Sequence, residues 1–193
     1  MRPIMIEFTG TPEAGKTTVI HRLKQMLETH GFSVTIIQES AETQPIEFPK
    51  GSWDANFWMR YISCANILHA LYIPCDIVII DRGVIDLQFW GIKYWKNNSC
   101  TKEEYFSYMN MFPKKLNPNF LIGLSVKPET ALIRRGGPGR IVNLDFLKEY
   151  NDLFLSFYDS ITVPKTLIDT SNLTVDEVVS QIYFMINKLL EAR

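Results

Sequence analysis

The residues best suited to chemistry lie near the N-terminus, where the run GTPEAGKTT begins at residue 10. This run matches the pattern GxxxxGK[ST], follows a predicted strand at 4–8 and opens a predicted helix at 15–30. The glycines let successive backbone N–H groups point into the loop, and the helix N-terminus adds positive potential, so the loop can hold a polyphosphate. The residues predicted to bind it are Gly10, Thr11, Pro12, Glu13, Ala14, Gly15, Lys16, Thr17 and Thr18.

Three side chains of this loop have distinct predicted roles. Lys16 should reach the β and γ phosphates of a nucleotide and act as a catalytic residue. Thr17 should offer its hydroxyl to Mg²⁺, because this hard cation prefers oxygen ligands and bridges phosphates. Thr18 should support the α phosphate. The loop therefore predicts ATP and Mg²⁺ as cofactors.

An acidic and a basic residue, Asp81 and Arg82, follow the predicted strand at 76–80. Asp81 would stand at the carboxyl edge of a parallel sheet, where ligands of open α/β folds bind, and could hold Mg²⁺ directly or through water. Arg82 would point toward the same crevice and bind the transferred phosphoryl group or the acceptor. The chain contains no Asp-x-x-Gly switch after this strand and no Asn-Lys-x-Asp motif, which argues against a GTPase.

Glu39 follows the predicted strand at 33–37 and should emerge at the same edge of the sheet. It is the candidate general base, because a carboxylate bonded to an acceptor hydroxyl can take its proton during transfer. Such bases contribute about 10² to 10⁴ in rate. The alternative is that Glu39 only positions the acceptor or pairs with Arg82.

The segment 134–140 reads Arg-Arg-Gly-Gly-Pro-Gly-Arg, which surrounds a flexible run with three arginines. This pattern predicts a lid. Closure would bring Arg134, Arg135 and Arg140 over the phosphates, where they would neutralise developing charge and exclude water. The alternative is a solvated basic loop.

An aromatic-rich helix is predicted after the second strand, within an acceptor region at about 42–72. A stripe at helical spacing should pack on the sheet, namely Phe57, Tyr61, Cys64 and Leu68. This leaves Trp53, Trp58 or Arg60 to line an acceptor pocket, with Phe89, Trp90 and Trp95 on its other side. Stacking by these rings would suit a planar acceptor such as a nucleobase.

These side chains must be positioned by an alternation of short apolar runs and longer amphipathic segments. Strands are predicted at 4–8, 33–37, 76–80, 120–126 and 166–168. Helices are predicted at 15–30, 54–71, 84–94, 102–111, 128–133, 144–160 and 174–190. The alternation predicts a three-layer α/β/α P-loop NTPase fold with a five-stranded parallel sheet. The strand at 76–80 is almost continuously β-branched, so it should be central and lie beside the first strand.

Length and composition limit the class of protein. A chain of 193 residues with no shift in composition is predicted to form one domain, 1–193. The 20 basic residues are matched by 21 acidic ones, so no excess charge is available to bind long nucleic acid or an acidic membrane. The sequence has no membrane-spanning stretch or signal peptide, and its three cysteines lack CxxC spacing. A cytoplasmic protein with small-molecule partners is expected.

These residues together resemble the thymidylate kinase and deoxynucleoside kinase group of P-loop kinases over nearly the whole chain. The loop GTPEAGKTT resembles the thymidylate kinase P-loop, and Ile80-Asp81-Arg82 resembles the family's Asp-Arg motif. The segment 124–132 resembles its fourth strand and following helix. Arg134, Arg135 and Arg140 fall where the group carries lid arginines.

The resemblance differs between subgroups at the acceptor side. Thymidylate kinases follow the second strand with Arg-Glu-Pro-Gly-Gly, whose arginine holds the acceptor phosphate, whereas 38–42 here reads Gln-Glu-Ser-Ala-Glu. Glu39 is instead similar to the glutamate that acts as base on a sugar hydroxyl in deoxynucleoside kinases. Asp81-Arg82-Gly83 departs from that subgroup's Glu-Arg-Ser or Asp-Arg-Ser. Together with Glu-Ser-Ala at 39–41, this segment also resembles a looser set of bacterial P-loop kinase-like ATPases.

The resulting prediction is an ATP- and Mg-dependent phosphotransferase acting on a small molecule, a nucleoside or nucleotide. One alternative is a thymidylate-type nucleoside monophosphate kinase, and another is a regulatory ATP-binding module with slow hydrolysis. The lid arginines favour catalysis, since capturing ATP does not itself require three of them. By analogy with related kinases, the helix at 54–71 is the candidate face of a homodimer.

Overall fold

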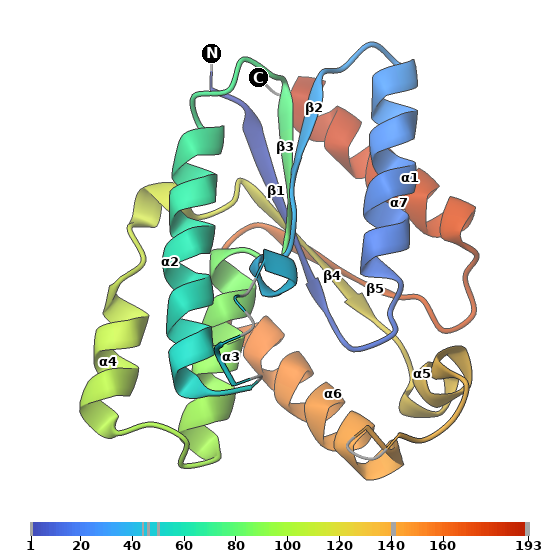
Figure 1. The fold of residues 1–193 in the computed structure, drawn as a ribbon. Helices are drawn as coiled ribbons and strands as arrows, with labels where there is room; N and C mark the ends of the chain where they lie inside the picture. Colours follow the sequence, from blue (N-terminus) through green and yellow to red (C-terminus); the bar gives the residue numbers. More distant parts are fainter. Residues whose placement is uncertain (1, 44, 46, 50, 140–141, 192–193) are drawn as a thin grey trace. The chain divides into compact units, whose positions relative to one another are not determined.

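A computed structural model describes residues 2–43, 45, 47–49, 51–139 and 142–191 of the chain. Its five strands form one parallel sheet in the order β2-β3-β1-β4-β5 (Figure 1). The strands are β1 Ile4–Gly10, β2 Val34–Ile37, β3 Ile77–Asp81, β4 Phe120–Ser125 and β5 Lys165–Asp169. The predicted five-stranded parallel sheet with flanking helices is confirmed.

The α-helices form where the periodicity predicts them, with each end within two residues of the prediction. They are α1 Lys16–Thr29, α2 Trp53–Ala70, α3 Val84–Lys96, α4 Lys102–Asn110, α5 Pro128–Arg135, α6 Leu144–Ser160 and α7 Val175–Glu191. Two short 3₁₀ turns, η1 Ser40–Thr43 and η2 Lys114–Leu116, follow β2 and precede β4. Local signals explain several boundaries: Thr101 and Glu104 form a capping box at the start of α4, and Pro128 occupies the first turn of α5.

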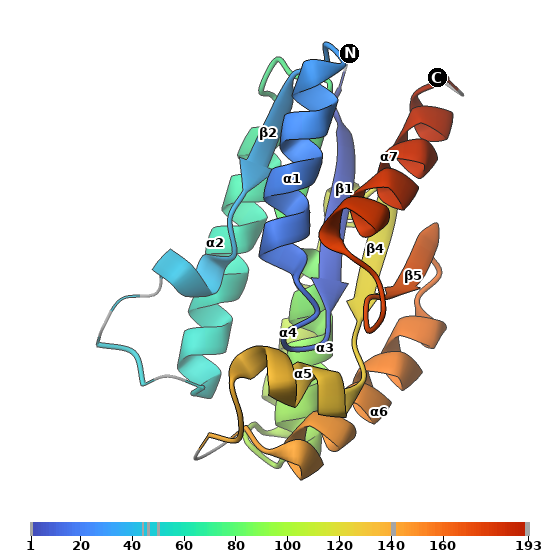
Figure 2. The ribbon, with the colours of Figure 1, turned by 90° about the vertical axis from the view of Figure 1, so that its right-hand side faces the viewer.

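The chain folds as two compact units. The first contains Met1–Thr9 and Thr35–Phe120, and in it α3 packs against both α2 and α4 (Figure 1). The second contains Gly10–Val34 and Leu121–Arg193, and in it α1 packs on α7 and α5 on α6 (Figure 2). The candidate acceptor-side residues therefore belong to the first unit, whereas the glycine-rich loop and the arginines of α5 belong to the second.

The centre of the first unit is the pair of strands β1 and β3. They run parallel in a register that places Glu7 opposite Ile80 and Phe8 opposite Asp81. Every residue of β3 is buried, as expected for a strand covered on both faces. The prediction that this strand is central and lies beside the first strand is confirmed.

The predicted packing stripe of α2 is wrong. Tyr61 is 56% exposed and Leu68 is 38% exposed. The buried residues of α2 are instead Ala55, Asn56, Arg60, Ser63, Ile67 and Ala70. The reason is a tertiary partner that periodicity does not reveal: the buried ring of Tyr108 on α4 contacts the rings of Trp53 and Phe57 and thereby sets the rotation of the helix.

Within the described residues, no helix combines the length and the apolar character needed to cross a lipid bilayer.

Candidate active site

The glycine-rich loop connects β1 to α1 and is anchored on the end of β4. Gly10 has φ +155°, and a Cβ built on it would lie 2.1 Å from the carbonyl oxygen of Leu124, so a side chain cannot be accommodated here. The Thr11 N–H donates to that same carbonyl at 3.0 Å. The Thr11 hydroxyl accepts a hydrogen bond from the Val126 N–H at 3.1 Å. These contacts fix the loop against the edge of the sheet.

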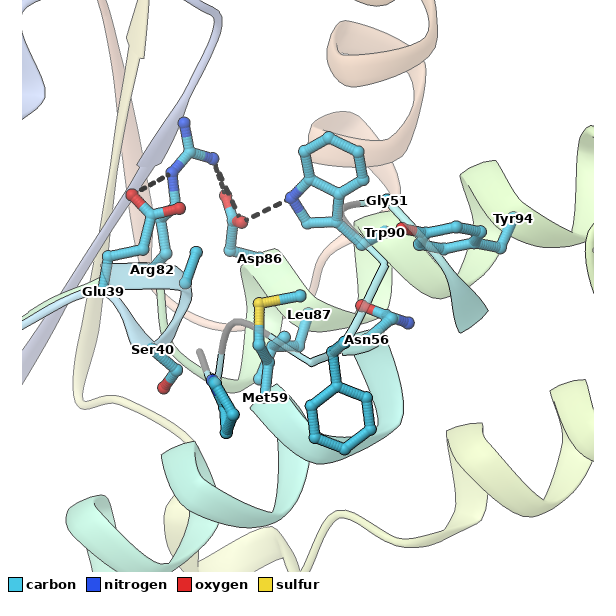
Figure 3. A pocket seen from close by; sticks show the side chains of 13 residues that line it. Glu39, Ser40, Gly51, Asn56, Met59, Arg82, Asp86, Leu87, Trp90 and Tyr94 are labelled. Carbon is cyan, nitrogen blue, oxygen red and sulfur yellow. Dashed lines mark hydrogen bonds and ion pairs between the residues drawn. The ribbon is translucent and has the colours of Figure 1, made fainter. Parts of the chain in front are cut away.

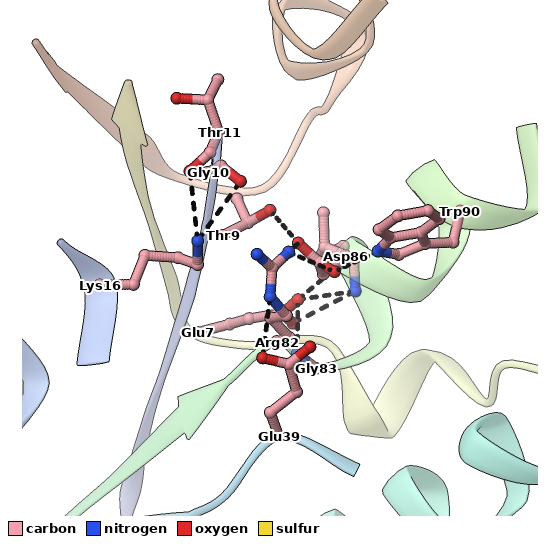
Figure 4. A network of polar contacts seen from close by, with 11 residues as sticks. Glu7, Thr9, Gly10, Thr11, Lys16, Glu39, Arg82, Gly83, Asp86 and Trp90 are labelled. Carbon is pink, nitrogen blue, oxygen red and sulfur yellow. Dashed lines mark hydrogen bonds and ion pairs between the residues drawn. The ribbon is translucent and has the colours of Figure 1, made fainter. Parts of the chain in front are cut away.

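Lys16 is the first residue of α1 and is only 8% exposed. Its ammonium group lies at the loop, with Nζ 3.5 Å from the Gly10 carbonyl oxygen and 3.4 Å from that of Thr11 (Figure 4). Gly15, in the left-handed region at φ +85°, is the N-cap residue of the helix. The exposed side chains of Thr17 and Thr18 follow at the start of the helix. A buried ammonium group at the N-terminus of a helix suits a polyphosphate.

Two of the three predicted lid arginines contact the glycine-rich loop. Arg134 donates from Nη1 to the Glu13 carbonyl at 3.2 Å, and from Nη2 to the Thr170 carbonyl at 2.6 Å. Arg135 forms an ion pair with the Glu13 carboxylate at 3.2 Å. Arg140 lies outside the described residues. Within the second unit, Arg134 and Arg135 thus lie at the glycine-rich loop, and α5 extends through these first two residues of the predicted lid.

The turn after β3 has an uncommon backbone conformation. Asp81 ends the strand and is 6% exposed, and Arg82 then adopts φ +58°, in the left-handed region that non-glycine residues rarely occupy. The Arg82 N–H donates to the Phe8 carbonyl at 3.0 Å. This turn directs the Arg82 side chain toward two carboxylates.

Arg82 is held between Glu39 and Asp86 (Figure 4). Its Nε lies 3.1 Å from Glu39 Oε2, and its Nη1 lies 3.0 and 3.1 Å from the two oxygens of Asp86. Asp86 also accepts hydrogen bonds from the Thr9 hydroxyl at 2.6 Å and from the Trp90 indole N–H at 3.1 Å. The predicted residues Glu39 and Arg82 therefore meet, and their pairing, one of the alternatives stated above, is observed.

Asp86 is a member of this network that sequence reasoning did not select. It is 1% exposed and stands four residues after Arg82 on the first turn of α3. The available signal was the i, i+4 spacing of an arginine and an aspartate at the start of a helix, where an acid is also favoured by the helix dipole.

Glu7 is a second residue that the sequence reasoning missed, although a lone charge inside the apolar run Ile4 to Phe8 was visible. Its fully buried carboxylate accepts hydrogen bonds from the backbone N–H groups of Gly83, Ile85 and Asp86, at 3.1, 2.9 and 2.8 Å. Glu7 therefore replaces the side-chain cap that α3 lacks. A Cβ on Gly83 would lie 2.7 Å from Glu7 Oε2, which explains why glycine follows Asp81-Arg82 here.

The pH dependence of stability should report on Glu7. Burial raises the pKa of Glu7 to about 8. The nearby Asp86 also raises this pKa, whereas the backbone N–H donors lower it. The folded state then binds the proton more tightly than the unfolded chain, so stability falls as the pH rises from about 5 to about 8. The slope is about 1.4 kcal/mol per pH unit for one group. The free energy of unfolding can be measured with denaturant across this pH range for the wild type and for Glu7→Gln. It should fall with this slope in the wild type and not in the variant.

A cavity of about 820 Å³ opens beside the Arg82 network, entirely within the first unit (Figure 3). Glu39, Arg82 and Asp86 contribute its charged wall, and the other lining residues are Ser40, Ala41, Pro45, Phe48, Gly51, Asn56, Met59, Leu87, Trp90 and Tyr94. The volume is in the range of small-molecule sites, and a mostly apolar lining with a few polar groups is typical of them.

Four residues predicted to bind the acceptor are not among the described residues that line this cavity. Trp53 packs against Tyr94 and Tyr108, and the Trp58 ring lies near Phe48. Phe89 is fully buried. Arg60 is fully buried as well, with its guanidinium carbon 3.7 Å from the centroid of the Tyr108 ring and 2.9 Å from that of the Phe112 ring.

The difference follows from the rotation of α2. Asn56 and Met59 face the cavity, while Trp53, Phe57 and Arg60 form the next stripe around the helix and face Tyr108 of α4. Burial in this aromatic cluster lowers the pKa of Arg60 to about 10, so the guanidinium remains charged at neutral pH. Cation–π contact with two rings compensates part of its desolvation.

Comparison with known proteins identifies the fold. Three structures of deoxyadenosine kinase from M. mycoides match at probability 1.00. The structure with the products dCMP and dCDP bound has a TM-score of 0.73 at 19% identity, covering 96% of this chain and 100% of that chain. The structure with dCTP bound has a TM-score of 0.73 at 20% identity, with the same coverage. The structure with dATP bound has a TM-score of 0.70 at 20% identity, covering 97% and 100%.

No family model matches the chain, and no curated protein is similar to it in sequence. The structural likeness at 19–20% identity establishes that the chain has the fold of these P-loop kinases. The predicted resemblance to the deoxynucleoside kinase group is therefore confirmed at the level of the fold.

Proposed function

We propose that this protein is a P-loop kinase that transfers the γ phosphate of ATP to a hydroxyl group of a nucleoside. The observation that carries the proposal is the pairing of Glu39, Arg82 and Asp86 at the wall of an 820 Å³ cavity. A carboxylate, a guanidinium and an enclosed space are the groups that phosphoryl transfer to a hydroxyl requires. The deoxyadenosine kinase fold supports the same proposal.

The proposed donor site is the glycine-rich loop of the second unit. Lys16 would contact the β and γ phosphates, and the loop N–H groups would bind the remaining oxygens. Arg134 and Arg135, which contact Glu13 of this loop, would neutralise charge on the transferred group together with Arg140. Thr17 and Asp81 are the proposed ligands of Mg²⁺, which would supply electrostatic stabilisation of the phosphates.

The charges of the cavity favour an uncharged acceptor over a nucleoside monophosphate. Among the described lining residues, Arg82 carries the only positive charge, and it is already paired with Glu39 and Asp86. A phosphate dianion in this cavity would meet two carboxylates and would have to compete with them for one guanidinium. A neutral sugar hydroxyl can instead donate a hydrogen bond to either carboxylate.

The proposed reaction needs one proton transfer. The acceptor hydroxyl loses its proton to the Glu39 carboxylate as its oxygen forms a bond to the γ phosphorus, while the bond from that phosphorus to the β–γ bridging oxygen breaks and ADP leaves. Arg82 would hold Glu39 in place and stabilise negative charge on the transferred group. Trp53, Trp58, Arg60 and Phe89 would contribute to this site through packing of α2 and α3 rather than through contact with the acceptor.

Replacing Glu39 by glutamine should lower kcat by about 10² to 10⁴ while KM for the acceptor changes little. Glutamine retains an oxygen that can accept from Arg82 but cannot take the proton. The measurement is transfer from γ-labelled ATP with Mg²⁺ to a panel of nucleosides, deoxynucleosides and their monophosphates, corrected for ATP hydrolysis. Glu103→Gln, an exposed acid on α4, is the matched control.

The outcomes separate the alternatives. Loss of kcat with nucleosides identifies Glu39 as the base, whereas a decrease below tenfold limits it to positioning. Transfer to monophosphates alone would favour a thymidylate-type kinase. Slow ATP hydrolysis with no transfer to any compound would contradict the kinase proposal and favour a regulatory ATP-binding module.

A further inference from the structure

The turn that carries Arg82 is attached to three consecutive residues of β1. The Arg82 N–H donates to the Phe8 carbonyl at 3.0 Å. The Thr9 hydroxyl donates to the Asp86 carboxylate at 2.6 Å. The Glu7 carboxyl group, on the same face of the strand as Thr9, accepts hydrogen bonds from three backbone N–H groups between 83 and 86 (Figure 4). All of these contacts lie within the first unit.

Glu7 fixes the backbone directly after Arg82. The Gly83 N–H donates to Glu7 Oε1 at 3.1 Å, while the N–H of Arg82 itself is bound to Phe8. The two peptide groups that flank the Arg82 Cα are therefore both hydrogen-bonded to β1. Arg82 has φ +58°, and a non-glycine residue keeps such a conformation only where its surroundings hold it. The direction of the Arg82 side chain consequently depends on Glu7.

Glu7 also fixes the partner of Arg82. The Asp86 N–H donates to the same Glu7 oxygen, Oε1, at 2.8 Å. The Asp86 carboxylate in turn lies with its two oxygens 3.0 and 3.1 Å from Arg82 Nη1. One oxygen atom thus binds both the residue that follows Arg82 and the residue that holds its guanidinium. A shift of this oxygen would move both.

Capping of a helix does not by itself require a buried acid. The N-terminus of α4, in the same unit, is capped by the exposed Thr101. At α3 the N-cap residue is Gly83, which has no side chain, and a carboxyl group with 0% exposure takes this role instead. Burial of the charged form of Glu7 is opposed by desolvation and by the nearby carboxylate of Asp86. Such a costly group is expected where the geometry of a site depends on it.

We propose that Glu7 is a positioning residue for phosphoryl transfer, which holds the Arg82 guanidinium in the place that the transferred group requires. This inference rests on the proposed kinase function. Glu7 is fully buried and is not among the described residues that line the cavity, so it acts through Arg82 and not through contact with the acceptor. Displacing a positioned group by about 1 Å can lower a rate by about 10²-fold.

The test compares two substitutions that differ in one hydrogen-bond acceptor. In full-length Glu7→Met, an apolar side chain of similar length replaces the carboxyl group and leaves the turn without its acceptor. In Glu7→Gln, the amide oxygen can take the place of Oε1. Transfer from γ-labelled ATP with Mg²⁺ is measured for both variants with the nucleoside that the wild type phosphorylates best.

Glu7→Met should lower kcat by about 10²-fold, while KM for ATP and for the nucleoside should change by less than about threefold. Glu7→Gln should keep kcat within about threefold of the wild type. Thr101→Ala removes a cap of the same kind from α4 and is the matched control, because its Tm should fall while its kcat should not.

If Glu7→Met does not fold, Glu7→Asp takes its place in every comparison. The shorter side chain retains the carboxylate but cannot reach all three N–H groups. Its kcat should therefore fall at least about tenfold.

A second background separates positioning from general damage to the fold. Arg82→Lys keeps the positive charge but lacks the planar guanidinium that binds Glu39 and Asp86, so its kcat should be low but measurable. If Glu7 acts through this guanidinium, adding Glu7→Met to Arg82→Lys should lower kcat further by less than about threefold. Loss of folded protein would instead give the same fold-change in both backgrounds.

Three results would overturn the inference while the proposed function stands. They are a folded Glu7→Met with nearly wild-type kcat, equal losses in Glu7→Met and Glu7→Gln, and equal fold-changes in the two Arg82 backgrounds. The absence of transfer by the wild type to every nucleoside in the panel would instead refute the proposed function, and the role of Glu7 with it.

Discussion

Replacing Lys16 by alanine is expected to lower kcat for phosphoryl transfer by at least about 10³-fold. This is the size of effect expected when one positive group that stabilises the transferred phosphate is lost. Lys16 is 8% exposed, and its ammonium group lies at the carbonyl oxygens of Gly10 and Thr11, within the loop that would hold the β and γ phosphates. Because few other groups in such a loop can supply a mobile positive charge at that place, no neighbouring side chain should compensate.

The measurement is transfer of labelled phosphate under single-turnover conditions, which separates chemistry from product release. Lys24→Ala removes an exposed ammonium from the same helix, where it pairs with Glu28, and should leave transfer unchanged. Melting temperatures of both variants should stay near that of the wild type. Full activity of Lys16→Ala would contradict the assignment of the phosphate-binding loop.

The second large effect is expected for Arg82→Ala, which should destabilise the protein by about 3–5 kcal/mol and abolish transfer. The side chain of Asp86 is only 2% exposed, so removing its ion-pair partner leaves an uncompensated buried charge. For a chain of this length, such a change corresponds to a fall in Tm of roughly 6–20 °C. Calorimetry and the transfer assay measure the two effects separately.

A double variant separates the electrostatic cause from loss of packing. Adding Asp86→Asn to Arg82→Ala removes the buried charge, so part of the lost stability should return while transfer remains absent. Arg22→Ala, which breaks the exposed pair with Asp176, should cost at most about 1 kcal/mol. If Arg82→Ala melts like the wild type, the Glu39–Arg82–Asp86 network is not a structural element of the site.

Local sequence was sufficient to predict the secondary structure and the glycine-rich loop between β1 and α1. The strands are short β-branched runs and the helices follow a 3.6-residue period, so both types of element were visible without tertiary information. Gly10 and Gly15 were identified by spacing, and their positive φ angles explain why glycine is required. The ends of β2 and β3 also indicated that Glu39 and Arg82 lie close together, and the two residues pair at the cavity wall.

The lining of the cavity was predicted less well, because it depends on how α2 is rotated. A helical period identifies stripes but does not say which stripe faces the cavity, and the ring of Tyr108 decided this by packing on Trp53 and Phe57. Asn56 and Met59 consequently line the cavity where Trp53, Trp58 and Arg60 were expected.

The sequence by itself determined the order of elements, the glycine-rich loop and the two charged residues at the strand ends, because each depends on residues that are close together in the chain. Only the tertiary structure revealed the contacts between distant residues: Glu7 as the cap of α3, Asp86 as the second partner of Arg82, and Asn56 as a buried residue of the cavity wall. The roles of these residues depend on their burial and on their partners in other elements, and the spacing of residues along the chain reveals neither.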